Sequence, residues 1–294
     1  MRKDLFYPPF GFLAPQAELT AFETARVVVL PVPYDATTTA RAGARNGPAA
    51  IIHASQDLEP YDLTLGFDTT QDGIHTLPEL APHSGSPQAM VDRVEAAVGD
   101  LLAAGKFVVT LGGEHTVAVG AVRAHARRYP DLSVLAIDAH ADLRDEYLDS
   151  PYNHACVLRR VLETCPVVMV GMRSVSADQV EFIRERDLTF LTPVAYRALP
   201  GPVELLRRLS SNVYVDIDLD GLDPAQMAAV GTPEPGGLFW DEVIALLTGL
   251  AAAKRIVGCD LTELAPDLGP PACATLAARL VQRLIGLALG PPAK

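Results

Sequence analysis

The sequence has few cysteines, and their spacing does not suggest a metal site. Cys156, Cys165, Cys259 and Cys273 stand apart in apolar surroundings, with no CxxC pair among them. Isolated cysteines of this kind are typical of buried free thiols in a reducing compartment. A cytoplasmic protein is therefore expected.

Basic side chains are also scarce relative to acidic ones. Lys and Arg total 24 against 36 for Asp and Glu, which gives a formal net charge of -12. Nucleic-acid phosphates repel a protein with this net negative charge, so no nucleic-acid partner is expected. A cationic small molecule is favoured instead.

Unbroken apolar segments are missing as well. Prolines at positions 8, 9 and 15 interrupt the apolar residues near the N-terminus, so no signal peptide is expected. The apolar segment 272–289 carries Arg279 and Arg283 one helical turn apart. This spacing predicts a packed amphipathic helix, and no membrane span is expected.

Strand and helix patterns alternate along the chain without a linker rich in Ser or Gly. Apolar runs predict strands at 26–33, 107–111, 132–137, 166–170, 188–191, 212–220 and 255–259. Helical spacing and start signals predict helices at 49–56, 86–104, 116–128, 155–163, 177–186, 238–253 and 272–289. Residues 1–25 are expected to be irregular, and residues 57–85 to be an excursion outside the sheet. The pattern predicts one domain over residues 1–294, a three-layer α/β/α fold with a mainly parallel central sheet.

The most informative stretch is Asp138-Ala139-His140-Ala141-Asp142, directly after the apolar run 132–137. Alternate residues of an extended backbone share a face, so the two aspartates and the histidine can converge on one point. In a parallel sheet the ligand site lies beyond the carboxyl ends of the strands. The stretch therefore predicts metal ligands at the end of a buried strand.

Two other predicted strands also end in residues that can bind metal. His115 follows the strand 107–111, and Asp218 and Asp220 follow the run beginning at Asn212. Four carboxylates brought together with two imidazoles would repel one another unless cations were bound. One ion would leave carboxylates unused, whereas two ions bridged by a shared Asp would use all six side chains. Mn²⁺ suits this mixed shell best, with Zn²⁺, Co²⁺ and Ni²⁺ as alternatives, and two ions would activate a bridging water as a nucleophile.

Three motifs resemble the signatures of the ureohydrolase family, which includes arginases and agmatinases. They are Gly-Gly-Glu-His-Thr at 112–116, Asp-Ala-His-Ala-Asp at 138–142 and Asp-Ile-Asp-Leu-Asp-Gly-Leu-Asp-Pro at 216–224. The stretches 231–237 and 41–48 extend the resemblance, which covers about residues 26 to 290. It implies an arginase-like fold and hydrolysis of a guanidino group to urea and an amine.

The resemblance also implies roles for individual residues. Two Mn²⁺ ions are expected, the first held by His115, Asp138, Asp142 and Asp218 and the second by Asp138, His140, Asp218 and Asp220. His154 would transfer protons, with Asp142 as a further proton acceptor and Asn153 beside the substrate. Glu263 would pair with the guanidinium group and aim its carbon at the nucleophile. Asp216, Asp223, Asp260 and Glu114 are expected to support the site or shape turns, and the other histidines to be structural.

Agmatine is the expected substrate, because Pro31 to Asp35 and Gly231 to Gly237 resemble agmatinases most. Its products would be putrescine and urea. The loop Asn153-His154-Ala155-Cys156 departs from the Ser-His-Gly-Thr of many agmatinases. N1-aminopropylagmatine, guanidinobutyrate, arginine and formiminoglutamate therefore stay open as substrates.

Two other classes of protein also stay open. A metal-dependent deacetylase would share the fold type but use a single ion, and a binding protein without activity could be built on the same fold. The resemblance further implies a homo-oligomer, a trimer or hexamer.

Overall fold

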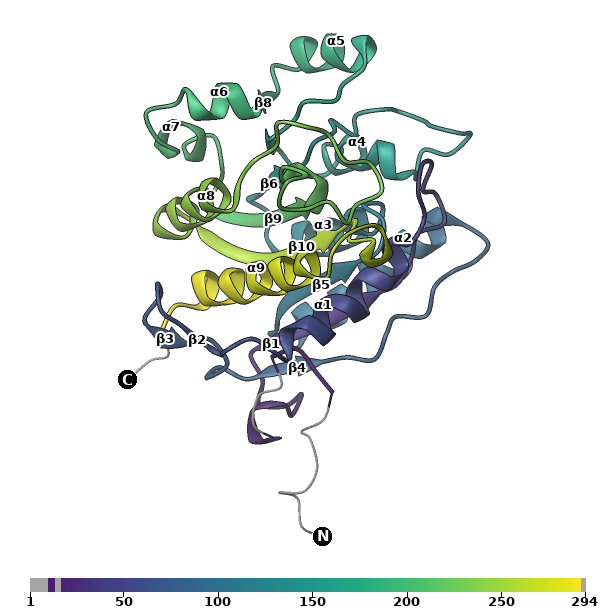
Figure 1. Ribbon diagram of the computed structural model, residues 1–294. Helices are drawn as coiled ribbons and strands as arrows, with labels where there is room; N and C mark the ends of the chain where they lie inside the picture. The colour runs from purple at the N-terminus through teal and green to yellow at the C-terminus, as the bar shows by residue number, and fades with distance from the viewer. Residues whose placement is uncertain (1–9, 14–16, 292–294) are drawn as a thin grey trace.

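The fold is built on an eight-stranded sheet in which every pair of neighbouring strands is parallel (Figure 1). A computed structural model describes residues 10–13 and 17–291. The strand order is β4-β1-β5-β10-β9-β6-β7-β8. The strands are β1 (Val27–Val32), β4 (Ile74–Thr76), β5 (Phe107–Gly112), β6 (Leu132–Ile137), β7 (Val167–Val170), β8 (Thr189–Leu191), β9 (Asn212–Asp218) and β10 (Arg255–Thr262).

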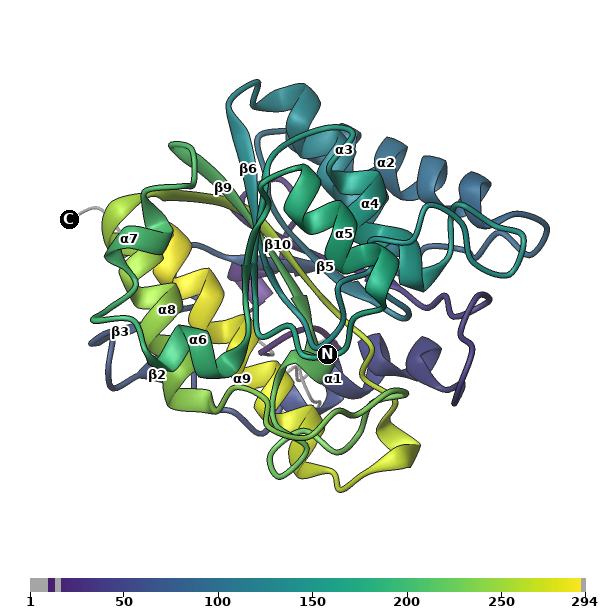
Figure 2. The same ribbon diagram turned by 90° about the horizontal axis from the view of Figure 1, so that it is seen from above.

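Helices cover both faces of the sheet, so the predicted three-layer α/β/α fold is confirmed (Figure 2). One face packs against α1 (Gly47–Ser55), α8 (Trp240–Ala253) and α9 (Ala272–Leu289), with the short helices α6 (Pro193–Arg197) and α7 (Val203–Leu206) beside them. The other face packs against α2 (Pro87–Ala103), α3 (Val117–Arg128), α4 (Val157–Val161) and α5 (Ala177–Glu185). The inner faces of both layers are apolar, and the central strands are therefore buried on both sides.

Helix α9 is long and apolar enough to cross a membrane, but it belongs to the core of the protein. Of its 18 residues, 61% are buried inside the protein. Arg283 is buried too, and its Nε lies 2.7 Å from Oδ2 of Asp62. The sequence prediction of a packed amphipathic helix is confirmed at its stated boundaries.

Some element predictions need correction. The stretch 57–85 is not wholly outside the sheet, because β4 pairs with β1 at the sheet edge. The same stretch also forms a small hairpin from β2 (Tyr61–Asp62) and β3 (Phe67–Asp68). Strand β10 continues past Cys259 to Thr262, and helices α6 and α7 occupy residues that carried no prediction. Part of the predicted irregular segment 1–25 lies outside the described residues; within the rest, Ala17–Leu19 form a single 3₁₀ turn.

The four strands that end in chemically active residues are neighbours in the middle of the sheet. Their order is β5-β10-β9-β6. Because all four run in the same direction, their carboxyl ends meet at one edge. His115, Glu263, Asp218 and Asp138 are thereby brought together from distant parts of the sequence.

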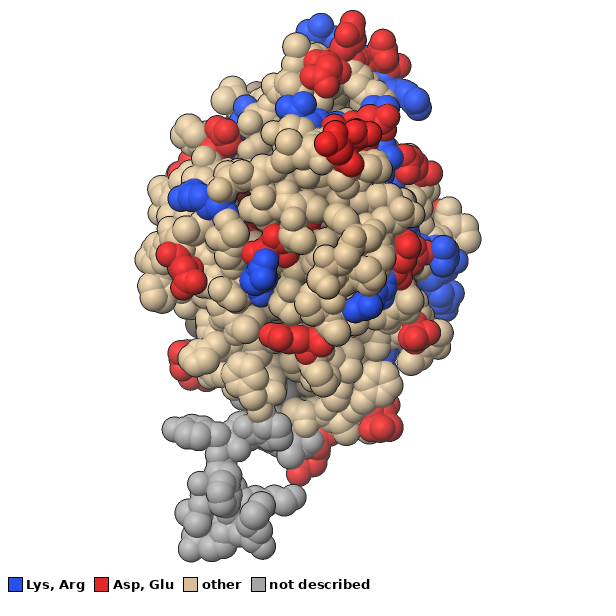
Figure 3. Space-filling view, turned by 90° about the vertical axis from the view of Figure 1, so that its right-hand side faces the viewer, with Lys and Arg blue, Asp and Glu red and all other residues tan. Residues whose placement is uncertain are grey.

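On the face shown in Figure 3, acidic and basic side chains are interspersed. The net negative charge of the chain is not gathered there into one broad patch.

Candidate metal centre and active site

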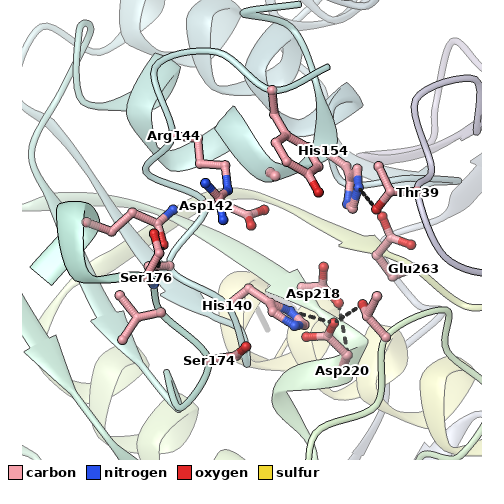
Figure 4. Close-up of a pocket in the computed structure, with 16 residues that line it drawn as sticks. Thr39, His140, Asp142, Arg144, His154, Ser174, Ser176, Asp218, Asp220 and Glu263 are labelled. Atoms are coloured by element: carbon pink, nitrogen blue, oxygen red, sulfur yellow. Dashed lines mark hydrogen bonds and ion pairs between the residues drawn. The ribbon is translucent and has the colours of Figure 1, made fainter.

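A cavity of about 330 Å³ opens at the carboxyl edge of these four strands (Figure 4). Most of the predicted site residues line it: His140, Asp142, His154, Asp218, Asp220 and Glu263. His115 and Asp138 are buried next to these residues, with exposed fractions of 0% and 1%. The structure therefore brings together residues that are up to 148 positions apart in the sequence.

The first group of side chains surrounds Nδ1 of His115. This atom lies 3.0 Å from Oδ2 of Asp142, 3.3 Å from Oδ2 of Asp138 and 3.5 Å from Oδ2 of Asp218. His115, Asp138 and Asp218 each offer a ligand atom, and these atoms lie within 4.8 Å of one another. The group could hold a metal ion.

The second group surrounds Nδ1 of His140. This atom lies 3.0 Å from Oδ2 of Asp220 and 3.7 Å from Oδ1 of Asp138. The three ligand atoms of His140, Asp220 and Asp138 again lie within 4.8 Å of one another. Asp138 belongs to both groups, as a bridging ligand would.

The electrostatics of the cluster favour bound cations. Burial, and then the charges of Asp220 and Asp138, raise the pKa of Asp218 well above its usual range. Burial opposes a charge on His115, yet the negative charge of Asp216 and the adjoining carboxylates of Asp138 and Asp142 raise the pKa of His115 well above its usual range. In both cases the crowded carboxylates favour added positive charge, either a bound proton or a cation.

One atom of Asp138 fits a metal ligand directly. Its Oδ2 is buried and accepts no hydrogen bond from the described residues. A buried carboxylate oxygen without a donor is costly unless a cation satisfies it. The oxygen and imidazole donors present are those that Mn²⁺ and similar divalent ions accept.

Glu263 is held in an unusual backbone conformation at the edge of the cavity. Its φ of 68° lies in the left-handed region that few non-glycine residues adopt, and Asp142 has a φ of 47°. Strain of this kind persists where the surrounding structure fixes a functional side chain. Oε1 of Glu263 accepts a 2.7 Å hydrogen bond from the backbone N–H of His115. The carboxylate is thus tied to the metal-binding group.

The two glycines before His115 allow this close packing. A Cβ at Gly113 would lie 2.1 Å from the carbonyl oxygen of Tyr34, and one at Gly112 would lie 2.6 Å from Cγ2 of Val117. Any larger residue at Gly113 would push β1 and β5 apart where they leave the sheet. The Gly-Gly pair therefore has a packing reason beyond a tight turn.

His154 lies at the cavity on the loop between β6 and α4 (Figure 4). Burial, and then the neighbouring imidazoles of His115 and His140, lower its pKa to about 4. Its Nε2 is 3.0 Å from the hydroxyl of Thr39. Asn153 is not among the cavity-lining residues, because its side chain accepts from the N–H of Ala155 and donates to the carbonyl of Thr37. The structure places Asn153 in the support of this loop, and its predicted contact with substrate stays a prediction.

Asp216 and Asp260 form a buried pair behind His115. They are partners in the register of β9 and β10, and both are fully buried. Asp216 lies 3.0 Å from Nε2 of His115. It can therefore hold the proton on that nitrogen and leave Nδ1 free to face the metal-binding group. Burial, and then the charge of Asp216, raise the pKa of Asp260 well above its usual range, which favours its protonated form.

Two further predicted supports take the places expected of them. Glu114 is buried and accepts a 2.6 Å hydrogen bond from the N–H of Thr37. Asp223 shapes a turn, because its carboxylate accepts from the N–H groups of Ala225, Gly236 and Gly237.

Sequence reasoning missed three residues that organise the site. Thr232 donates a 3.0 Å hydrogen bond to Oδ2 of Asp220. The guanidinium of Arg173 donates to the carbonyl oxygens of Asp220, Leu222 and Glu234 and so fixes the loop after β9. Thr39, from the loop after β1, reaches His154. Only Thr232 carried a signal, since it lies in the predicted stretch 231–237.

Comparison with known proteins agrees with this geometry. The sequence profile of the Arginase family matches residues 25–286. The chain is 39% identical over 287 residues to an N(1)-aminopropylagmatine ureohydrolase from Synechocystis sp., covering 95% of this chain and 94% of that protein. It is 35% identical to an agmatinase from Bacillus anthracis, over 84% of this chain and 86% of that protein. Among solved structures, the agmatine ureohydrolase of Thermoplasma volcanium superposes with a TM-score of 0.84 at 34% identity, covering 92% of each chain. The family match, the relatives and the shared fold together identify the chain as a ureohydrolase that belongs to the arginase family.

Proposed function

We propose that this protein hydrolyses the guanidino group of a linear guanidino amine to urea and the free amine. The observation that carries the proposal is the meeting of two Asp and His groups at Asp138, beside a cavity that also contains His154 and Glu263. The two Asp and His groups offer sites for two cations. His154 and Glu263 add groups for proton transfer and for pairing with a guanidinium.

We infer that the cofactor is two Mn²⁺ ions per chain. His115, Asp138, Asp142 and Asp218 would hold the first, and Asp138, His140, Asp218 and Asp220 the second. The mixed imidazole and carboxylate shell supports Mn²⁺, since no thiolate is at hand. When bound, the ions would polarise a water molecule and make it nucleophilic near neutral pH.

The protein's own residues would position the substrate and move protons. The guanidinium carbon is a poor electrophile because its charge is spread over three nitrogens, so its placement matters. Glu263 would form charge-assisted hydrogen bonds with the guanidinium and aim its carbon at the nucleophile. Asp142 would accept the proton of the attacking water, and His154 would exchange a proton with the leaving amine.

The substrate is either agmatine, as the sequence motifs indicate, or N1-aminopropylagmatine. The identities support the second compound, since relatives with that name match at 38–40% and the agmatinases at 31–35%. Both substrates present the same guanidinobutyl group to the metal centre. They differ in the aminopropyl group that the second compound carries on the amine at the other end of this chain.

The experiment, after loading with Mn²⁺, measures urea release from agmatine, N1-aminopropylagmatine, arginine and guanidinobutyrate, and formamide release from formiminoglutamate. We expect the highest kcat/KM with one of the first two. Absence of urea release from the guanidino compounds would contradict the proposed reaction. Measurement of bound metal separates the classes, because two ions per chain are expected here and a single zinc would indicate a deacetylase-like site.

We further propose a cytoplasmic homo-oligomer, a trimer or hexamer. The four cysteines are buried and form no disulfide among the described residues, which supports the compartment. Sedimentation of the purified protein tests the oligomeric state, and a monomer would contradict it.

A further inference from the structure

The loop after β1, which lies far in sequence from the metal-binding residues, reaches the active-site cavity. Residues Thr37, Thr38 and Thr39 follow β1, whereas His154 follows β6. Thr39 and His154 lie side by side at the cavity wall in Figure 4. Both line the cavity.

Two hydroxyl groups of this loop hold His154. Oγ1 of Thr39 lies 3.0 Å from Nε2 of the imidazole ring. Oγ1 of Thr37 accepts a 3.0 Å hydrogen bond from the backbone N–H of His154. The Thr37 bond fixes the backbone of His154, and the Thr39 contact fixes Nε2 of its imidazole ring.

The loop is itself anchored to a buried carboxylate. Oε2 of Glu114 accepts from the N–H of Thr37 at 2.6 Å, and Oε1 accepts from the hydroxyl of Thr37 at 2.7 Å. Because the Thr37 hydroxyl donates its proton to Glu114, its lone pairs stay available for the N–H of His154. A continuous chain of hydrogen bonds therefore links the residue before His115 to His154.

The hydroxyl of Thr39 suits a ring that changes its protonation state. A neutral imidazole has one N–H and one bare nitrogen, and a protonated ring has two N–H groups. A hydroxyl can donate to a bare Nε2 or accept from a protonated one. Since Thr39 takes up Nε2, Nδ1 is the nitrogen left for proton exchange with the substrate.

We propose that Thr39 is a positioning residue for proton transfer by His154. Its hydroxyl holds Nε2 in both protonation states and keeps Nδ1 directed to the leaving amine. The proposal rests on the proposed guanidino hydrolysis. It assigns a function to the loop after β1, which contributes no metal ligand.

The test compares Thr39→Val, which removes the hydroxyl at nearly constant volume, with Thr39→Ser, which keeps it. We expect Thr39→Val to lower kcat about 10-fold to 100-fold, a part of what general acid-base catalysis contributes. KM and metal content should stay within about two-fold of the parent enzyme, and Thr39→Ser should restore most of kcat. Thr38→Val is the matched control, because the Thr38 hydroxyl lies 3.4 Å from Glu114 and serves the same loop.

A double variant distinguishes positioning of His154 from a general effect on the loop. In a His154→Ala background, Thr39→Val should cause no further loss of kcat, because the ring that it positions is gone. Additive losses would overturn the proposal. So would an unchanged kcat in Thr39→Val, or equal damage in Thr39→Ser.

A second readout does not depend on turnover. In ¹⁵N-histidine spectra, Thr39→Val should shift the Nε2 resonance of His154 and leave that of His125 unchanged. If the parent enzyme released no urea, the proposed reaction would fail, while this spectrum would still report the Thr39 contact. An unshifted His154 resonance would overturn the positioning role itself.

Discussion

At the scale of single residues, the site depends on side chains that belong to two networks at once. Asp138 takes part in both metal-binding groups. Glu263 faces the cavity and also accepts the backbone N–H of His115. A substitution at either position should therefore be designed to remove one property and keep the other.

Glu263→Gln removes the charge of the side chain while an amide oxygen can still accept the N–H of His115. We expect kcat/KM for the guanidino substrate to fall about 10-fold to 100-fold, because a charge-assisted hydrogen bond contributes about 1.5–3 kcal/mol. Metal content should be unchanged. Steady-state kinetics together with metal analysis checks the prediction, and equal kcat/KM in the two proteins would show that Glu263 does not pair with the substrate.

A second prediction at this scale concerns stability in acid. His125 is fully buried, and burial lowers its pKa to about 4 from its ordinary value of 6.5. The unfolded chain binds a proton at this residue below about pH 6.5, whereas the folded protein does so only near pH 4. The free energy of unfolding should therefore fall as the pH drops through this window, by on the order of 3 kcal/mol from this residue.

The measurement is urea unfolding between pH 7 and pH 4 for the parent and for His125→Gln. The variant should lose stability less steeply over that range. His53→Gln is the control, since it removes an exposed histidine. Parallel curves for the parent and His125→Gln would contradict the assignment.

At the scale of elements, the strands whose ends form the site could be predicted, and the elements held by tertiary contacts could not. Strands β5, β6 and β9 are apolar runs that end in polar motifs, and their existence is confirmed, although β9 ends at Asp218 and Leu219–Gly221 form a 3₁₀ turn. Strand β4 has only three residues and depends on pairing with β1. The end of β10 was missed because Asp260 and Thr262 interrupt its apolar pattern, although both are fully buried. A sequence pattern cannot show that polar residues such as these will be buried inside a strand.

The site shows the same division. The convergence of His115, Asp138 and Asp218 follows from strand direction alone, so the sequence could predict it. The contact of Thr39 with His154 joins two loops 115 positions apart. Such contacts depend on loop conformations, and these are not encoded by periodicity.

Helix α9 and the β2–β3 hairpin are joined by a buried ion pair, which leads to a third prediction. Arg283 and Asp62 have side-chain exposures of 9% and 2%. Asp62→Asn would leave the guanidinium buried without a counter-charge, at a cost of about 3–5 kcal/mol. The amide can keep the hydrogen bonds that Oδ1 accepts from Thr64 and Leu65. The measurement is chemical unfolding.

The double variant Asp62→Asn with Arg283→Met supplies the control. It removes both charges and should recover much of the stability lost in Asp62→Asn alone. A double variant as unstable as the sum of the single variants would show that the charges do not interact.

At the scale of the whole molecule, the fold concentrates negative charge where its scaffold is most rigid. The middle strands are buried on both faces, and the three carboxylates of the two metal-binding groups converge with Asp142 at their ends. The rigid sheet keeps these groups at contact distance even though they repel one another. The repulsion between these carboxylates lowers the stability of the metal-free fold, and the sheet keeps the cation sites preformed.

Removal of metal should therefore destabilise the entire protein, and removal of one carboxylate should partly reverse this. Chelation by EDTA is expected to lower Tm, because an ion at 100 times its Kd stabilises the folded state by about 2.7 kcal/mol. Asp218→Asn should have a higher Tm than the parent when both are free of metal, because it relieves repulsion with Asp138 and Asp220. The same variant should gain less from added Mn²⁺. Differential scanning calorimetry with EDTA and with Mn²⁺ measures all four states, and a metal-free variant less stable than the metal-free parent would show that repulsion does not limit the stability of the site.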